Sequence, residues 1–264
     1  MRIEARDLAF GYRGHPVGRE VSLALGAGQV MCLLGPNGSG KTTLFKTLLG
    51  LLPAQGGEVL IDGAGLGSRK RHEIARLVSY VPQAHTAFFP YSVREIVLMG
   101  RTAHLGVFSS PSRHDKDIAL AALGRLGLAH LADSVYTRIS GGERQLTLVA
   151  RALAQEARIV VMDEPTANLD FGNQVRVLGH VQDLARSGIG VLLSTHDPDH
   201  AFLCADQVVL LRAGVVLDMG APEAVVTEAS LRTLYGVTVR ITEVDDGAAG
   251  RRRVCVPALA ARSR

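Results

Sequence analysis

Apolar and polar positions follow the two-residue period of strands in several parts of this chain of 264 residues. Three short apolar runs predict buried strands, and five weaker alternating stretches predict half-buried ones. The buried strands are expected over 30–34, 159–162 and 190–194. The others are expected over 2–10, 21–25, 58–61, 207–211 and 215–219, with the last two paired around the Ala213-Gly214 turn.

Apolar residues recur at helical spacing between these strands. They predict helices over 43–49, 92–99, 142–156 and 173–186, and another that begins near Asp115. Strands that alternate with helices predict an α/β fold with a largely parallel sheet. Residues 11–18 and 79–90 predict irregular segments, and the Gly-, Ala- and Arg-rich chain from Gly236 onward is expected to be loosely held.

The segment after the first apolar run fits the P-loop pattern G-x-x-x-x-G-K-[ST] and lies between a predicted strand and a predicted helix, as that motif requires. Its glycines allow backbone N–H groups to turn toward an anion, and the helix N-terminus adds partial positive charge. Lys41 is therefore expected to reach the β- and γ-phosphates of a nucleotide, and Thr42 to bind Mg²⁺. The loop comprises Gly35, Pro36, Asn37, Gly38, Ser39, Gly40, Lys41 and Thr42.

Two adjacent carboxylates, Asp163 and Glu164, follow the apolar run over 159–162 and precede Pro165. In a P-loop protein the first typically binds Mg²⁺, and the next can accept a proton from the attacking water. Because successive strand side chains point to opposite faces, both acids can serve one site only if the strand ends at Asp163. The alternative is a solvated acidic strand end.

A second anion-binding end is predicted at the start of the helix over 142–156. Ser140 is a favourable N-cap, and Gly141 and Gly142 leave backbone N–H groups exposed. Two such ends in one chain suggest a site shared between two copies, in which the Ser140 end of one copy completes the P-loop of the other. The alternative is a plain helix cap.

Composition narrows the possible classes of protein. The net charge of +4 is not gathered into a dense basic stripe, so nucleic acid is not expected as a ligand. No apolar run approaches the roughly 18 residues that span a bilayer, and the N-terminal segment lacks the apolar region of a signal peptide. The three cysteines form no C-x-x-C pair, which is typical of free thiols in a reducing compartment.

These motifs, in this order, resemble the nucleotide-binding subunit of an ATP-binding cassette (ABC) transporter over residues 1–235. Gln83 is similar to the Q-loop glutamine, and residues 140–143 resemble the signature motif. Asp163-Glu164 resembles the Walker B end, residues 167–170 resemble the D-loop, and His196 resembles the switch histidine. The adenine-stacking aromatic residue of the family corresponds to Tyr12, placed beside Gly11 in a predicted loop, with Phe10 as the alternative.

The resemblance implies two copies that bind two ATP molecules head to tail with Mg²⁺. It implies a P-loop NTPase core, an N-terminal antiparallel β subdomain and a helical subdomain at about 84–155, all within 1–240, followed by a tail over 241–264. The implied catalytic residues are Lys41, Gln83, Glu164 and His196, and the implied Mg²⁺ ligands are Thr42, Gln83 and Asp163. Implied nucleotide contacts are Tyr12, the loop residues 35–42, Thr43, Ser140, Gly141, Gly142 and Asp170.

Two positions depart from the family pattern. Glu143 replaces the commoner glutamine of the signature motif, which leaves a contact between this side chain and nucleotide in doubt, and Asn168 replaces a small residue of the D-loop. The segment from His196 to His200 has two histidines four residues apart, but Pro198 between them argues against a helical metal site. A metal site is therefore not expected there.

Residues 91–101, His104 and residues 170–174 are similar to importers of iron chelates, haem, cobalamin and molybdate. This similarity implies import of an iron chelate or haem, with membrane permease subunits and a periplasmic binding protein as partners, at the cytoplasmic face of the inner membrane. An exporter subunit and a soluble ABC ATPase are the alternatives. The segment Phe88-Phe89-Pro90-Tyr91 is expected either to form a socket for a helix of the permease or to pack in the core.

Overall fold

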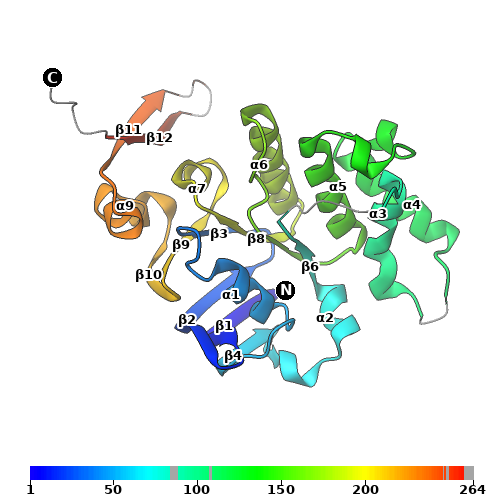
Figure 1. The fold of residues 1–264 in the computed structure, drawn as a ribbon, viewed down its shortest axis with the longest axis horizontal. Helices are drawn as coiled ribbons and strands as arrows, with labels where there is room; N and C mark the ends of the chain where they lie inside the picture. Colours follow the sequence, from blue (N-terminus) through cyan, green and yellow to red (C-terminus); the bar gives the residue numbers. More distant parts are fainter. Residues whose placement is uncertain (84–88, 107–108, 246, 248–249, 259–264) are drawn as a thin grey trace.

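The computed structural model describes residues 1–83, 89–106, 109–245, 247 and 250–258. A six-stranded sheet with strand order β10-β9-β3-β8-β7-β6 runs through its centre (Figure 1). The neighbouring pairs β6–β7, β7–β8, β8–β3 and β3–β9 are parallel, and the edge strand β10 is antiparallel to β9. The predicted parallel sheet is thus confirmed. Its strands are β3 (Val30–Leu34), β6 (Val78–Val81), β7 (Ile159–Met162), β8 (Gly190–Thr195), β9 (Gln207–Arg212) and β10 (Val215–Gly220).

Alternate residues of β3 belong to two hydrophobic clusters on opposite faces of this sheet. Met31 and Leu33 pack with helix α1 (Lys41–Leu48) and the N-terminal strands, whereas Cys32 and Leu34 pack with the helices of the other face. Every residue of β3 is buried, so the two-residue period is hidden in a continuous apolar run. The P-loop between β3 and α1 is therefore fixed to a strand that is packed on both faces.

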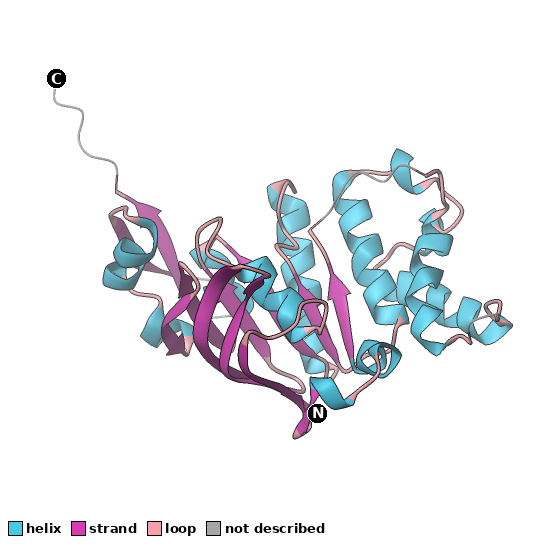
Figure 2. Ribbon diagram, turned by 60° about the horizontal axis from the view of Figure 1, so that its bottom comes forward, coloured by secondary structure: helices cyan, strands magenta, loops and turns pink. Residues whose placement is uncertain are grey.

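A second, antiparallel sheet lies against α1 with strand order β2-β1-β4-β5, and Figure 2 shows its curvature. The predicted loop over 11–18 was wrong, because β1 and β2 continue to a tight turn at Arg13 and Gly14. Gly14 has a φ of 77°, a value that glycine adopts without strain. The strands are β1 (Arg2–Tyr12), β2 (His15–Gly26), β4 (Gly56–Ile61) and β5 (Ala64–Gly65).

The predicted helices are confirmed within a few residues. Helices α3, α4 and α5 pack against one another at the side of the parallel sheet away from β10 (Figure 1). The segment expected to be irregular from 79 begins instead with β6. The helices are α2 (Arg71–Leu77), α3 (Val93–Leu98), α4 (Arg113–Arg125), α5 (Gly141–Ala154), α6 (Phe171–Arg186) and α7 (Pro198–Cys204), with 3₁₀ turns η1 (Leu66–Ser68), η2 (Met99–His104), η3 (Ala129–Leu131) and η4 (Tyr136–Arg138).

The expectation that the chain after Gly236 is loosely held was wrong for most of it. Helices α8 (Pro222–Val225) and α9 (Glu228–Tyr235) lead into a hairpin of β11 (Val239–Asp245) and β12 (Arg251–Pro257). Val239 is buried, and Ile241 and Cys255 pack on the main hydrophobic cluster. Charged residues share the face of Val239, Ile241 and Cys255, namely Glu243, Asp245, Arg251 and Arg253, which conceals the strand pattern in the sequence. The last residues of the predicted tail, 259–264, lie outside the described residues.

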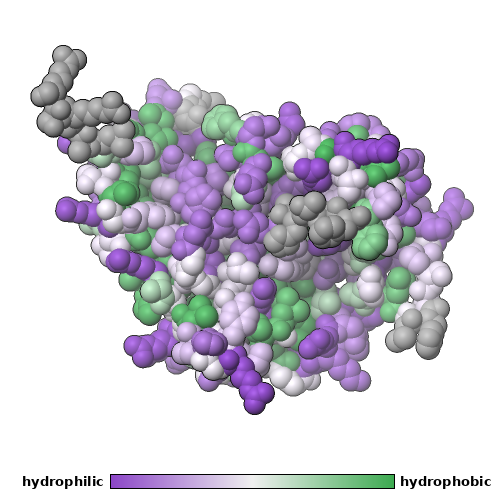
Figure 3. All heavy atoms as spheres, in the orientation of Figure 1, coloured by the Kyte–Doolittle hydropathy of each residue, from purple (hydrophilic) through white to green (hydrophobic). Residues whose placement is uncertain are grey.

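The face of the molecule drawn in Figure 3 carries hydrophilic residues over most of its area and apolar residues in small, separate patches. Among the described residues, no helix is both long enough and apolar enough to cross a membrane.

Candidate functional site

The P-loop wraps the N-terminus of α1. Lys41 is buried, and its Nζ donates hydrogen bonds to the carbonyls of Gly35 at 2.8 Å and Pro36 at 3.1 Å. Gly40, the N-cap residue, has a φ of 102°, and a Cβ there would lie 2.9 Å from Cγ1 of Val17. No side chain caps this helix. The first N–H groups of α1 are therefore left to bind an anion.

Asp163 and Glu164 are held by one serine of the neighbouring strand. The Ser194 hydroxyl donates to Asp163 Oδ1 at 2.7 Å and accepts from the Glu164 backbone N–H at 2.9 Å. Strand β7 ends at Met162, as predicted, and Glu164 has a φ of 45°. This left-handed backbone ends the alternation of the strand, so the Glu164 side chain is not forced to the face opposite Asp163. Sequence reasoning missed Ser194, although it ends a buried apolar run as Asp163 does.

Glu164 lies between two cationic or titratable side chains. Its Oε1 is 3.2 Å from Lys41 Nζ, and its Oε2 is 3.4 Å from His196 Nδ1. The Glu164 side chain is 13% exposed and that of His196 is 54% exposed, so the carboxylate is largely buried and the histidine is open to solvent. The structure thus brings together three residues that the sequence predicted from three separate motifs.

A cavity of about 460 Å³ opens over these groups. Gln83, Thr42 and Glu164 line it together with the loop backbone, so the predicted glutamine reaches the P-loop from another strand end. Val17 of β2 also lines the cavity and was not singled out in the sequence. The complete lining is Val17, Asn37, Gly38, Gly40, Lys41, Thr42, Thr43, Gln83 and Glu164.

Oxygen donors suited to Mg²⁺ surround this cavity. Thr42, with its hydroxyl, and Gln83, with its amide oxygen, line it, and the carboxylate of Asp163, next to the lining residue Glu164 in the chain, is buried. Asp163 Oδ2 also accepts from the Tyr80 hydroxyl at 3.3 Å. Burial and the Asp163 charge raise the pKa of Tyr80, which therefore stays protonated and can donate. This hydroxyl, amide and carboxylate set fits a small, hard cation.

Ser140, Gly141 and Gly142 lie at a different place, at the start of α5. Ser140 Oγ accepts from the Glu143 N–H at 3.3 Å, and Glu143 Oε2 accepts from the Ser140 N–H at 2.7 Å. Hydrogen bonds from Ser140 to the Glu143 carboxylate lower its pKa. The signature position at which the sequence departs from the family is therefore used for a capping box within the chain.

Asp170 lies beside this second group and not in the P-loop cavity. It caps α6, accepting from the Asn173 N–H at 2.8 Å and from Asn173 Nδ2 at 2.9 Å. A Cβ on Gly142 would lie 2.4 Å from Asn173 Cγ, so α5 and α6 meet closely at this point. Neither Ser140, Gly142 nor Asp170 lines the P-loop cavity of the same chain.

Tyr12 and Phe10 occupy different environments. The Phe10 side chain is fully buried, whereas Tyr12 is 44% exposed and free to stack on a ligand. Tyr12 lies at the end of β1, opposite His15, and not in the loop that the sequence predicted. Of the two candidates, Tyr12 alone is accessible.

The second histidine of the His196–His200 segment is structural. His200 is buried, with Nδ1 3.0 Å from Thr195 Oγ1 and Nε2 3.4 Å from Asp197 Oδ2. Burial lowers its pKa. Pro198 is in the first turn of α7, as expected. Over the described ranges, no group of three or more His, Cys, Asp or Glu side chains could hold a metal ion.

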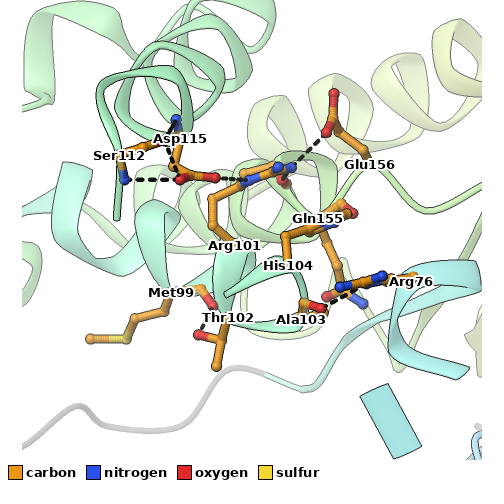
Figure 4. A network of polar contacts seen from close by, with 11 residues as sticks. Arg76, Met99, Arg101, Thr102, Ala103, His104, Ser112, Asp115, Gln155 and Glu156 are labelled. Carbon is orange, nitrogen blue, oxygen red and sulfur yellow. Dashed lines mark hydrogen bonds and ion pairs between the residues drawn. The ribbon is translucent and has the colours of Figure 1, made fainter. Parts of the chain in front are cut away.

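Arg101 and His104, both noted in the sequence, belong to a polar network that joins η2 to α4 and to the end of α5 (Figure 4). The buried Arg101 guanidinium contacts Asp115 at 2.9 Å and Glu156 at 2.6 Å. His104 Nε2 lies 2.8 Å from the Gln155 carbonyl. In this structure both residues therefore make contacts within the chain, away from the P-loop.

Comparisons with known proteins agree with this geometry. A family model described as "ABC transporter" matches residues 19–167. An uncharacterized ABC transporter ATP-binding protein of Haemophilus influenzae is 43% identical over 235 residues, which cover 89% of each chain.

Further relatives and a solved structure are named for import. The hemin import ATP-binding protein HmuV of Nocardia farcinica is 38% identical and aligns with 91% of this chain and 85% of its own length. The molybdate import ATP-binding protein MolC of Haemophilus influenzae is 36% identical, with 88% and 87% covered. A metal-chelate type ABC transporter, solved in an inward-facing conformation, has a TM-score of 0.86 at 32% identity, with 97% of each chain covered.

Proposed function

The chain belongs to the ATP-binding subunits of ABC transporters, which hydrolyse ATP to power transport, and we propose that it drives the import of an iron chelate or haem. The observation that carries the ATPase assignment is the single cavity lined by the P-loop, Gln83 and Glu164. A phosphate-binding loop and a carboxylate that can take a proton from water meet there, and this is the arrangement that phosphoryl transfer to water needs.

We propose the following roles within that cavity. The loop N–H groups and Lys41 bind the β- and γ-phosphates, and Thr43 contacts a phosphate oxygen. Thr42, Gln83 and Asp163 would hold Mg²⁺, which neutralises phosphate charge when bound. Glu164 orients the attacking water and accepts its proton, and His196 stabilises the γ-phosphate. Lys41 Nζ lies 3.2 Å from Glu164 Oε1, so a bound phosphate would offer the lysine a competing anionic partner and free the carboxylate for water.

We infer that two copies assemble head to tail. Ser140, Gly141, Gly142 and Asp170 do not line the P-loop cavity of their own chain, yet they lie together where the N-terminal ends of α5 and α6 meet. These groups can contact the phosphate only when they belong to a second copy. Adenine would stack on the exposed ring of Tyr12.

The proposed membrane partner is a permease. The Phe89 side chain is 66% exposed and its ring centroid lies 6.1 Å from that of Tyr91, which disfavours the core-packing alternative; Phe88 lies outside the described residues. A groove of about 350 Å³ is lined by Leu51 and Met99, whose side chains are also exposed. We propose that these apolar groups form the socket for a permease helix at the cytoplasmic face of the inner membrane. Phe89→Ala should weaken assembly with the permease, and intact assembly and transport would exclude a role for this ring.

Hemin is named in several relatives and molybdate in another, so the substrate needs a test of its own. Affinity purification of the tagged chain from detergent-solubilised membranes tests it. Recovery of a permease, with a periplasmic binding protein that binds haem or an iron chelate, would support the proposal. Export would instead yield a permease without a binding protein, and recovery without any membrane partner would indicate a soluble ABC ATPase. The ATP turnover of the purified chain is measured separately.

A further inference from the structure

A residue outside the nucleotide-binding motifs makes a hydrogen bond to the His196 backbone. The Tyr235 hydroxyl, on the last residue of α9, donates a hydrogen bond to the His196 carbonyl at 2.9 Å. On the other side, the carbonyl of Thr195 accepts from the Gly35 N–H of the P-loop at 3.3 Å. The switch histidine is thus held between the P-loop and a helix that lies 39 residues further along the chain.

The segment after His196 is braced as well. The Asp197 N–H donates to Thr195 Oγ1 at 3.0 Å, which fixes the turn that leads into α7. Asp199 Oδ1 accepts from the Cys255 N–H of β12 at 2.8 Å. The C-terminal hairpin therefore contacts the same short stretch that Tyr235 contacts.

Hydrogen bonds join α8, α9 and the C-terminal hairpin to one another. The Ile241 N–H of β11 donates to Glu228 Oε1 at 3.0 Å at the start of α9, and Arg253 donates to the Glu223 carbonyl of α8 at 2.7 Å. Leu231 and Leu234 anchor α9 in the core. Burial and nearby anionic groups raise the pKa of Tyr235, so its hydroxyl remains a donor across the physiological range.

We propose that Tyr235 is a positioning residue for ATP hydrolysis, which acts by holding the His196 carbonyl so that the imidazole stays beside Glu164. Nδ1 of the exposed imidazole lies 3.4 Å from Glu164 Oε2, and the placement of the ring depends on the backbone that carries it. The inference rests on the proposed role of His196. It gives the α9–hairpin unit a function, since this unit is the scaffold that presents the hydroxyl.

Tyr235→Phe tests the proposal because it keeps the ring and removes the hydroxyl. A neutral hydrogen bond is worth about 1 kcal/mol, so we expect the kcat for ATP hydrolysis to fall about fivefold. The KM for ATP should change less than about twofold, because ground-state binding is not affected. The matched control is Thr233→Val on the same helix, whose hydroxyl bonds only the Ala229 carbonyl in the described contacts and should be dispensable.

A double-mutant cycle separates positioning from general structure. If Tyr235 acts through His196, Tyr235→Phe should have no further effect in a His196→Ala background, with residual rates read by single-turnover assays over hours. A further fivefold loss in the double mutant, a wild-type kcat in Tyr235→Phe, or a rise in KM without loss of kcat would overturn the proposal.

The single mutant His196→Ala keeps the two hypotheses apart. If His196→Ala hydrolyses ATP like the wild type, the proposed role of the histidine fails. If His196→Ala is impaired and Tyr235→Phe is not, only the positioning role fails. The melting temperature of Tyr235→Phe should stay close to that of Thr233→Val, and a large drop restricted to Tyr235→Phe would assign the hydroxyl to stability instead.

Discussion

The P-loop end and the Ser140 end of this molecule are both helix N-termini with nearby glycines, yet they are organised differently. At the P-loop no side chain caps α1, and groups from several separate segments converge on one cavity. At Ser140 the helix is closed by its own capping box, and its neighbours Asp170 and Asn173 serve the joint between two helices. The first end gathers groups from separate segments into one cavity, whereas the second keeps its polar groups within two helix caps.

Among the substitutions that test this difference between the P-loop end and the Ser140 end, Glu164→Gln should have the largest effect. The amide keeps the size of the side chain but cannot take a proton from water, so turnover should fall by about 10²-fold to 10⁴-fold. ATP binding should persist, and an ATP-bound dimer should accumulate. Steady-state turnover, equilibrium ATP binding and size-exclusion chromatography with ATP check these outcomes. Full turnover would remove Glu164 from its role.

Ser194→Ala should have the next largest effect. It removes the group that fixes both carboxylates and leaves the buried Asp163 without its 2.7 Å hydrogen bond. We expect the kcat to fall about 10-fold to 100-fold and the free energy of unfolding to fall by about 1–3 kcal/mol. Ser79→Ala is the control, since Ser79 is also a buried serine of the parallel sheet. Equal effects of the two substitutions would mean that Ser194 has no special role.

Gly142→Ala tests whether the Ser140 end acts through a second copy. Its Cβ would lie 2.4 Å from Asn173 Cγ, whereas a Cβ on Gly141 has its nearest neighbour at 4.0 Å. Gly142→Ala should weaken ATP-driven dimerisation about tenfold, because overpacking costs about 1–3 kcal/mol and displaces the helix end. ATP binding to the single chain should remain. Analytical ultracentrifugation with ATP, with Gly141→Ala in parallel, measures the difference, and equal dimerisation of the two variants would contradict the interpretation.

Glu143→Ala should have the smallest effect. Loss of the capping box should cost about 1 kcal/mol of unfolding free energy at pH 7. The pKa of Glu143 is lowered in the folded chain, so its contribution is present above the unfolded pKa of about 4.3 and is lost as pH falls through the folded pKa. Denaturant titrations at several pH values should therefore converge for the wild type and Glu143→Ala in acid. Glu143→Gln keeps an acceptor, and it should retain most of the stability without this pH dependence.

Much of the fold was readable from the sequence because the relevant signals are local. Apolar runs marked β3, β7 and β8, weaker alternation marked β9 and β10, and Ser140 marked the start of α5, whereas β6 was missed. The hairpin over 239–257 was missed because its strands are largely exposed and rich in arginine, so they lack the apolar alternation of a packed face. The loop over 11–18 was predicted from its Gly and Pro residues. This prediction was wrong because Gly and Pro there occupy the ends of two long strands.

The sequence by itself determined which chemical groups this protein carries and in what order, because the P-loop and the paired acids are recognised from short spacings and His196 from the family resemblance. The tertiary structure alone decided how these groups meet. Ser194 bridges Asp163 and Glu164, Glu143 caps its own helix, and Tyr235 reaches His196 from a distant segment. Such contacts join residues whose separation along the chain carries no periodic signal, so they follow from the packing of the sheet, the helices and the C-terminal hairpin.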